Sequence, residues 1–170
     1  MRNLTMLTDL YQLTMMYGYF KHGMENNEAV FDLFFRKTRE NSAYAVMAGL
    51  ESVINYINNL HFANEDIEYL RSLELFDEDF FNKLRTMRFT GELYAMPEGT
   101  IVFPHEPLLR IKAPIMQAQL IETALLNIVN HQTNIATKAS RVVYAANGDA
   151  VLEFGLRRAQ GPDAGIYGAR

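Results

Sequence analysis

The stretch from Met116 to Phe154, MQAQLIETALLNIVNHQTNIATKASRVVYAANGDAVLEF, decides the fold class of this chain. Its first part, through Ala146, repeats apolar residues at helical spacing and predicts one long helix. Asn147-Gly148-Asp149 ends that helix, and Val151 to Phe154 has the pattern of a short buried strand. A helix that feeds a single buried strand is typical of the start of a parallel α/β structure, which needs further strands to cover it. We therefore expect half of a domain to be missing from these 170 residues.

The chain before this stretch alternates between helical and strand patterns. Helices are expected from Thr8 to His22 with Thr8 as N-cap, from Leu50 to Leu60, and in two short segments capped by Asn64 and Asp77. Strands are expected at Ala29 to Arg36, Tyr44 to Ala48, Thr90 to Met96, Thr100 to Phe103 and Leu108 to Lys112. Prolines between the last three strands favour an antiparallel meander.

These elements predict an architecture with both α+β and α/β parts. Residues 1–114 form an α+β sandwich domain, residues 115–147 a long connecting helix, and residues 148–170 the first strand of an incomplete α/β barrel. The glycine-rich residues after Phe154 have the composition of neither a packed strand nor a helix interior.

Composition excludes several classes of function. With 49% hydrophobic and 12% aromatic residues, the chain has enough apolar material for the core of one soluble domain. The net charge of -4 arises from interspersed acids and bases without a basic stripe, which argues against a nucleic-acid partner. No apolar run approaches the roughly 20 residues that span a bilayer, and the start lacks a secretory pattern, so we expect no membrane partner and a cytoplasmic location. Without cysteine the chain has no disulfide, thiolate metal site or Cys nucleophile.

The strongest chemical pattern follows the predicted strand, in the sequence Glu153-Phe154-Gly155-Leu156-Arg157-Arg158-Ala159-Gln160-Gly161. Barrel enzymes place their chemistry where strands end in loops. The ring of Phe154 can stack on a ligand, and Gly155 lets the backbone approach that ligand closely. The guanidinium of Arg157 can donate two parallel hydrogen bonds to a carboxylate or phosphate. The alternative is a core phenylalanine beside solvated arginines. The residues taken together favour a site for an aromatic acid, with Arg158 as a weaker candidate.

Three further groups are weaker candidates when taken alone. Asp9 and Tyr11 flank the first turn of a predicted helix, where an acid also complements the helix dipole. His131 and Lys138 line up on the flank of the long helix, but a helix histidine is more often a satisfied core residue. Arg36 ends an apolar strand, where it could meet phosphate, but the solvated end of a strand is the favoured interpretation. No residue pattern indicates a metal site.

The chain resembles a known enzyme family. Its motifs are Thr8 to Gln12, Phe31 to Arg36, Ala48 to Glu51, Phe89 to Gly91, Pro97 to Gly99, Glu122-Thr123, Asn130 to Thr133 and Glu153 to Gly161. They occur in this order in nicotinate phosphoribosyltransferases, and the similarity runs from Thr8 to the last residue.

The resemblance implies a reaction and a barrel of the type II phosphoribosyltransferase kind. The enzyme joins nicotinate to phosphoribosyl pyrophosphate, forms nicotinate mononucleotide and pyrophosphate, and couples this step of NAD salvage to ATP hydrolysis. Mg²⁺ would accompany the phosphates. By similarity, Phe154 and Tyr11 sandwich the pyridine ring, and Asp9 and Tyr11 reach in from the second subunit of a homodimer with a shared active site.

The resemblance also assigns the arginines and one residue outside this chain. Arg157 would lie along the nicotinate and phosphoribosyl groups, and Arg36 would approach phosphate from the partner subunit. The histidine that ATP phosphorylates in this family lies beyond Arg170, so we expect a polypeptide of these 170 residues to lack full activity.

Other interpretations remain open at the sequence level. The chain fits a non-catalytic remnant that keeps a dimer surface, or a nicotinamide-using or quinolinate-using relative. A dedicated sheet-based binding domain would require a self-contained core. The run from Leu156 to Gly161 resembles the nicotinate-using branch.

Overall fold

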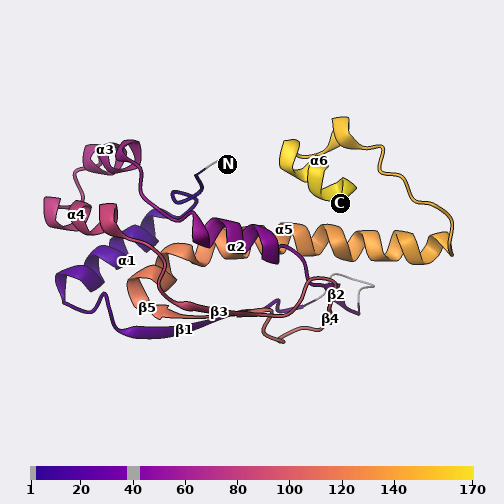
Figure 1. The fold of residues 1–170 in the computed structure, drawn as a ribbon, viewed down its shortest axis with the longest axis horizontal. Coiled ribbons are helices and arrows are strands. Elements are labelled where there is room, and N and C mark those ends of the chain that lie inside the picture. Colours follow the sequence, from indigo (N-terminus) through magenta and orange to yellow (C-terminus); the bar gives the residue numbers. More distant parts are fainter. Residues whose placement is uncertain (1–2, 38–42) are drawn as a thin grey trace.

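A computed structural model describes residues 3–37 and 43–170 (Figure 1). The helices are α1 (Leu10–Lys21), α2 (Leu50–Asn58), α3 (Asn64–Ser72), α4 (Glu78–Thr86), α5 (Ile115–Ala146) and α6 (Pro162–Ala169), with a 3₁₀ turn η1 (Leu156–Arg158). The strands are β1 (Glu28–Leu33), β2 (Ala45–Val46), β3 (Glu92–Ala95), β4 (Ile101–Val102) and β5 (Leu109–Pro114). Helix and strand types follow the sequence prediction through residue 146, with ends shifted by a few residues.

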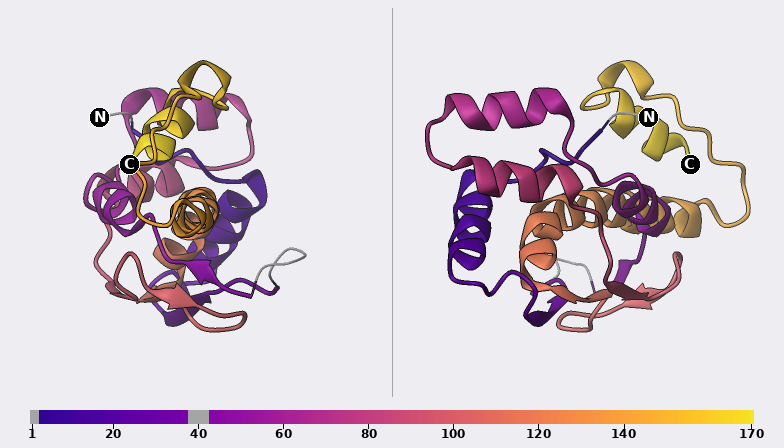
Figure 2. Two further views of the ribbon diagram at one scale, coloured as in Figure 1. Left: turned by 90° about the vertical axis from the view of Figure 1, so that its right-hand side faces the viewer. Right: turned by 60° about the vertical axis from the view of Figure 1, so that its left-hand side comes forward.

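The long helix α5 organises the molecule. Figures 1 and 2 show it running across the sheet on one side, with α2 alongside it and α6 on the side away from the sheet. It starts directly after β5 and ends at Asn147, whose φ of 48° lies in the left-handed region. Asn is one of the few residues that adopt this conformation readily, so Asn147 is the predicted stop signal of the helix.

The larger sheet has three antiparallel strands in the order β1-β5-β3. On the central strand β5, Leu109, Ile111 and Ala113 are buried. On the opposite face Arg110 forms a two-pronged ion pair with Asp32 of β1, at 2.7 and 2.8 Å. The strict alternation on β5 therefore sets one face on the helices and leaves a charged face outside.

The predicted meander of three consecutive strands is wrong in its middle strand. β3 pairs with β5, but β4 leaves that sheet and pairs with β2, with Ala45 opposite Val102. The turn Pro97-Glu98-Gly99 redirects the chain, because Gly99 has a φ of 85° that favours glycine. β2 and β4 therefore form a separate small sheet.

Hydroxyl groups of α5 hold the β2 segment in place. The Val46 N–H donates to Thr137 Oγ1 at 2.9 Å, and the Ala48 N–H donates to Thr133 Oγ1 at 3.2 Å. The Thr133 hydroxyl donates in turn to the Ala48 carbonyl at 3.2 Å. Because threonines four residues apart share a helix face, α5 serves this two-residue strand as a polar partner in place of a third strand.

An aromatic cluster joins α1 to α4. The ring of Phe80, which is fully buried, lies 5.1 Å from Tyr17, 5.7 Å from Phe20 and 5.2 Å from Phe76 between ring centroids. The Tyr17 hydroxyl donates to Asp77 Oδ2 at 3.0 Å. Asp77 also accepts the Phe80 N–H at 3.0 Å and is the predicted N-cap of α4.

Two other predicted helix caps lie one residue from their observed positions. The N-cap of α1 is Asp9, because Thr8 turns its hydroxyl to the side chain of Gln12. The N-cap of α3 is Ala63, and Asn64 is the first helical residue. There Asp66, the third helical residue, supplies the reciprocal half of a capping box, since its Oδ2 accepts the Ala63 N–H at 2.8 Å.

The prediction of a buried strand at Val151 to Phe154 is wrong for this structure. These residues have no strand pairing, and Leu152 is 81% exposed. A strand needs a neighbour for its N–H and C=O groups, and no described strand of this chain lies beside this segment. The glycine-rich region after it contains a helix, α6, which sequence analysis did not expect. Pro162 at its first position explains the start, because proline is well tolerated there.

Candidate active site

Asp9 and Tyr11 lie at the start of α1, beside the first half of α5. Between them and α5 lies a polar network centred on the buried side chain of Gln12. Its Nε2 donates to Glu122 Oε2 at 3.0 Å, and its Oε1 accepts from Thr123 Oγ1 at 2.8 Å. Two predicted motifs more than 100 residues apart, Thr8 to Gln12 and Glu122-Thr123, therefore meet in one cluster.

Both candidate side chains of this cluster are accessible. Tyr11 is 51% exposed, and Asp9 is exposed with its Oδ2 3.3 Å from the Thr123 hydroxyl. Partial desolvation and the nearby carboxylates of Glu122 and Asp9 raise the pKa of Tyr11 above its ordinary value. The phenol thus stays protonated at neutral pH and can donate a hydrogen bond to a ligand.

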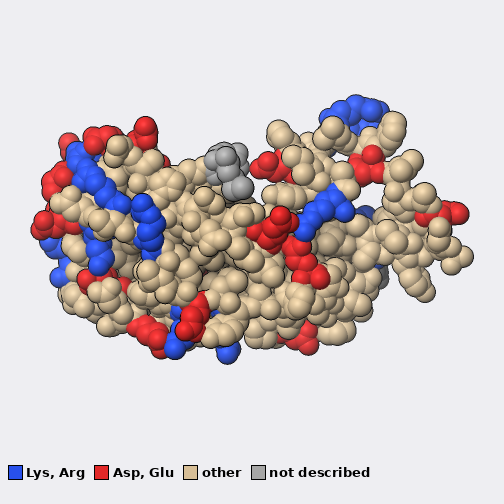
Figure 3. All heavy atoms as spheres, in the orientation of Figure 1, with Lys and Arg blue, Asp and Glu red and all other residues tan. Residues whose placement is uncertain are grey.

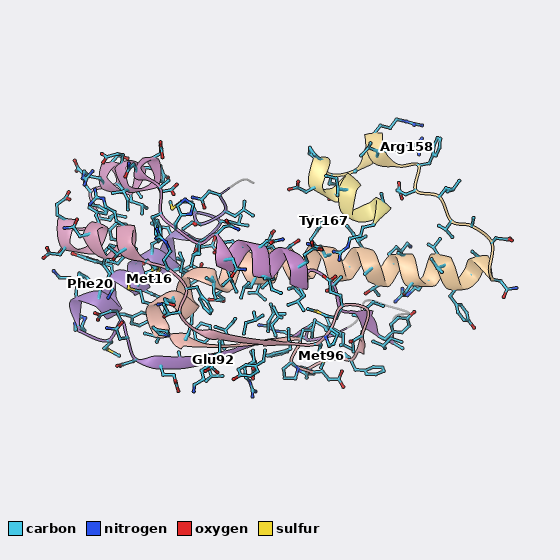
Figure 4. All side chains as sticks on the ribbon, viewed as in Figure 1. Met16, Phe20, Glu92, Met96, Arg158 and Tyr167 are labelled. Atoms are coloured by element: carbon cyan, nitrogen blue, oxygen red, sulfur yellow. The ribbon has the colours of Figure 1, made fainter. Side chains whose placement is uncertain are left out.

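Phe154, Arg157 and Arg158 project from the segment after α5. Phe154 is 84% exposed, and both arginines lie in η1 with exposed side chains. Figure 3 shows basic atoms standing out from the surface over η1, where Figure 4 labels Arg158. Within residues 3–37 and 43–170, neither arginine has a carboxylate within ion-pair distance. An aromatic face and two available guanidinium groups thus share one short segment.

The short turn around Gly155 is held by local contacts. The Gly155 N–H donates to the Glu153 carboxylate, and the Arg158 N–H donates to the Gly155 carbonyl at 2.7 Å. Leu156 packs on α6 so closely that a Cβ at Gly165 would lie 2.3 Å from its Cδ1. A side chain at position 165 would therefore force the end of the Leu156 side chain to move.

α6 itself is tied to the body of the protein. The Tyr167 ring meets the ring of His131 edge-on at 6.0 Å, and its hydroxyl lies 3.4 Å from Ser52 Oγ. Arg170 reaches Glu98 at 2.6 Å. The weak candidate His131 is thus a packing partner of α6 in this structure, while Lys138 is exposed.

The remaining sequence candidates lie apart from these groups. Arg36 follows β1 and is exposed, next to the Phe35 carbonyl that accepts the His105 N–H at 2.9 Å. Gln132, a buried neighbour of the candidate His131, is hydrogen-bonded as a buried amide should be, because its Nε2 donates to Ser52 Oγ at 2.9 Å. A cavity of about 400 Å³ lies elsewhere, between α2 and β3, and contains none of the candidates.

No described residues form a group of three or more His, Asp or Glu side chains that could hold a metal ion.

A single chain does not bring the two main candidate groups together. Asp9 and Tyr11 adjoin Thr123, near the beginning of α5, whereas Phe154 follows the far end of that helix. About 35 Å of helix separate Thr123 from Ala146 at 1.5 Å per residue.

Sequence reasoning missed the role of Gln12 in this arrangement. The available signal was a polar residue next to Leu13 and four residues before Met16, on the face of α1 that proves to be buried.

Comparison with known proteins identifies the family. The family profile described as nicotinate phosphoribosyltransferase (NAPRTase) N-terminal domain matches residues 6–130. The chain belongs to the nicotinate phosphoribosyltransferase family. A relative in this family, the nicotinate phosphoribosyltransferase of Bacillus subtilis (strain 168), is 49% identical over 168 residues, which cover 99% of this chain and 34% of that protein.

Solved structures agree with this placement. The crystal structure of human nicotinic acid phosphoribosyltransferase superposes with a TM-score of 0.86 at 38% identity, covering 95% of this chain and 33% of that one. Nicotinate-nucleotide pyrophosphorylase from Pyrococcus furiosus shares the fold, with a TM-score of 0.73 at 24% identity over 98% of this chain and 37% of its own. The mixed helix and sheet fold is thus that of the N-terminal part of this phosphoribosyltransferase family. The chain spans about a third of the length of the relatives it matches.

Proposed function

We propose that these 170 residues serve as the N-terminal part of a cytoplasmic nicotinate phosphoribosyltransferase of NAD salvage. The enzyme joins nicotinate to phosphoribosyl pyrophosphate, gives nicotinate mononucleotide and pyrophosphate, and couples the step to ATP hydrolysis. The observation that carries this proposal is the exposed Phe154 with the unpaired guanidinium groups of Arg157 and Arg158 on the same short segment, in a chain of this family.

This segment suits a planar aromatic acid. A ring stacked on Phe154 gains about 0.5–1.5 kcal/mol beyond area burial. A nearby guanidinium recognises a carboxylate or phosphate through paired N–H donors. Nicotinate offers both features, a pyridine ring and a carboxylate, whereas nicotinamide lacks the negative charge.

The reaction demands positioning more than acid or base chemistry. The pyridine nitrogen attacks the sugar carbon C1 as pyrophosphate leaves, so positive charge develops on the ribose ring in the transition state. The residues of this chain would hold the ring plane and the carboxylate, and leave the nitrogen free to attack. Mg²⁺ supplies charge neutralisation for the phosphates when bound, and no described cluster of this chain provides its ligands.

A second copy would complete the site. Asp9 and Tyr11 lie near one end of α5 and Phe154 follows the other, and no contact joins these two groups within the described part of the chain. In a homodimer, Tyr11 and Asp9 of one subunit would face Phe154 and Arg157 of the other, and Arg36 would approach the phosphate from the same side as Tyr11. Gly155, Arg158, His131 and Lys138 are secondary members of this proposed site.

A chimera tests the proposal. In this chimera, residues 1–170 replace the matching N-terminal third of the Bacillus subtilis relative, which is 49% identical over 168 residues. Nicotinate mononucleotide is measured by chromatography with and without ATP, and the unaltered relative serves as the control.

The outcomes separate the candidate functions. Formation of nicotinate mononucleotide from nicotinate, stimulated by ATP, with no nicotinamide mononucleotide formed from nicotinamide, supports the proposal. A folded chimera without turnover, alongside an active control, would mean that this chain is a remnant without catalytic competence. Turnover of nicotinamide in preference to nicotinate would place the chain with a nicotinamide-using relative.

A further inference from the structure

Gln12 is a fully buried polar residue with every polar atom of its side chain paired. Its Oε1 accepts from the hydroxyl groups of Thr8 and Thr123 and from the Asp9 N–H at 3.4 Å. Its Nε2 donates to Glu122 Oε2, which also accepts from Gln119 Nε2 at 3.2 Å. A buried amide of this kind favours a single arrangement of its neighbours, because any displacement leaves several hydrogen-bonding groups unpaired.

The network allows one orientation of the amide. Glu122 is an acceptor when ionised, so it requires the NH₂ end of Gln12. The Asp9 N–H is a donor, so it requires the carbonyl end. A flipped amide would place two oxygens together on one side and two donors together on the other. Gln12 therefore fixes both the first turn of α1 and its rotation relative to α5.

Asp9 and Tyr11, which precede Gln12 in this turn, are both exposed. The backbone N–H of Asp9 donates to Gln12 Oε1, and the Asp9 carboxylate oxygen Oδ2 lies 3.3 Å from the Thr123 hydroxyl. That hydroxyl has a single proton and lies closer to Gln12, at 2.8 Å. The Asp9 carboxylate therefore keeps acceptor capacity for a ligand, and Tyr11 is directed to the surface beside it.

We propose that Gln12 is a positioning residue for nicotinate binding, which locks the start of α1 on α5 and thereby aims Tyr11 and Asp9 at the ligand. This inference rests on the proposed function, because it requires Tyr11 and Asp9 to contact the pyridine substrate. It goes further in naming a buried residue that touches no substrate and yet sets the affinity for one substrate only. Phosphoribosyl pyrophosphate would bind through other groups.

The first test compares Gln12→Ala with Met16→Ala in the chimera. Met16 is also fully buried on α1, but it lies outside the polar network, so its truncation reports general loosening of the helix. For Gln12→Ala we expect the KM for nicotinate to rise about tenfold or more, with kcat and the KM for phosphoribosyl pyrophosphate changed less than about threefold. Equal effects of both variants on the KM for nicotinate would reduce Gln12 to an ordinary core residue.

A reciprocal exchange provides the rescue. Gln12→Glu alone sets two carboxylates 3.0 Å apart and is expected to raise the KM for nicotinate at least as much as Gln12→Ala. Adding Glu122→Gln restores an amide donor opposite a carboxylate acceptor, while the hydroxyl groups of Thr8 and Thr123 can still donate to residue 12. Gln119, which donates to the same Glu122 oxygen, then has to turn its amide so that its Oε1 accepts from residue 122. We expect the double variant to recover most of the affinity for nicotinate. Failure of the exchange to improve on Gln12→Glu would overturn the proposed role of the pair.

A second measurement separates failure of this inference from failure of the proposed function. In the 170-residue chain, 3-fluorotyrosine at position 11 reports its surroundings by ¹⁹F NMR without any substrate. Gln12→Ala is expected to shift this resonance and to lower the pKa of the Tyr11 phenol, since a displaced Tyr11 loses its partial desolvation and its place beside Glu122. Met16→Ala is expected to leave both unchanged. An unaltered fluorine signal in Gln12→Ala rejects the positioning role even if the chimera is active, whereas a shifted signal with an inactive chimera rejects only the proposed function.

Discussion

The carboxylate of Glu98 accepts the backbone N–H of Gly49 at 2.7 Å and so joins the turn after β3 to the start of α2. Gly49 has a φ of 105°, a conformation that side chains rarely adopt. A Cβ at this position would also lie 3.3 Å from the Ile128 carbonyl oxygen of α5. The glycine is therefore required both by its backbone angle and by its close approach to the long helix.

Gly49→Ala is expected to destabilise the chain by about 1–3 kcal/mol, because the strained angle and the tight contact add. Urea denaturation followed by circular dichroism measures the loss. Gly18→Ala is the matched control, since Gly18 lies within α1 and a Cβ there meets nothing within 4 Å. That control is expected to be neutral or to stabilise by up to about 1 kcal/mol. Equal stability of the two variants would contradict the role assigned to Gly49.

The same carboxylate links stability to pH. Partial burial pushes the pKa of Glu98 upward, but the Gly49 N–H and the Arg170 guanidinium outweigh this and lower it below its ordinary value. A lowered pKa means that the ionised carboxylate stabilises the fold above the unfolded pKa of about 4.3. This contribution is lost as the pH falls through the lower, folded pKa.

Glu98→Gln is therefore expected to be less stable than the parent at pH 7, with a difference that shrinks below about pH 4. Urea midpoints between pH 7 and pH 3 measure this difference. Glu51→Gln serves for comparison, because Glu51 is more exposed and lies 3.4 Å from the same guanidinium. A smaller, salt-sensitive loss is expected there. A difference for Glu98→Gln that stays constant across this pH range would exclude the proposed linkage.

The hydroxyl of Thr137 gives a third prediction. It receives the Val46 N–H at 2.9 Å and donates to the Thr133 carbonyl at 2.6 Å. Thr137→Val keeps the shape but leaves the half-buried Val46 N–H without its partner, so we expect a loss of about 1–3 kcal/mol. Lys138→Ala, on the exposed side of the same turn, is expected to stay within about 0.5 kcal/mol of the parent. Hydrogen exchange at Val46 would rise in Thr137→Val alone.

Sequence patterns predicted the elements that local rules control. The 3.6-residue period of α5, the strand predicted at Leu108 to Lys112 and the Asp77 cap each depend on residues close together in the sequence, and each is confirmed. The pairing of β4 with β2 could not be predicted in this way, because strands this short carry little pattern and find their partner through a turn and a helix elsewhere in the chain.

The candidate site, too, has parts that the sequence could predict and parts that it could not. The motif order indicated Asp9, Tyr11, Phe154 and Arg157, but no local pattern could show that Gln12 meets Glu122 and Thr123, since that contact spans 110 or more positions. The buried strand at Val151 to Phe154 failed for the opposite reason. Its apolar composition is real, but burial depends on neighbouring strands, and the described chain supplies none.

Substitution of Phe154 distinguishes a role in substrate binding from a role in packing. Its ring is 84% exposed in this chain. Phe154→Ala is therefore expected to leave the free energy of unfolding of the 170-residue chain, measured by urea denaturation, within about 0.5 kcal/mol of the parent. In the chimera the same change removes the stacking face, and we expect the KM for nicotinate to rise about tenfold or more. Tyr144→Ala is the matched control, since this aromatic residue near the end of α5 is 88% exposed and belongs to neither candidate group. Loss of stability in Phe154→Ala, or an equal rise in KM in Tyr144→Ala, would mean that the exposed ring serves packing rather than the pyridine substrate.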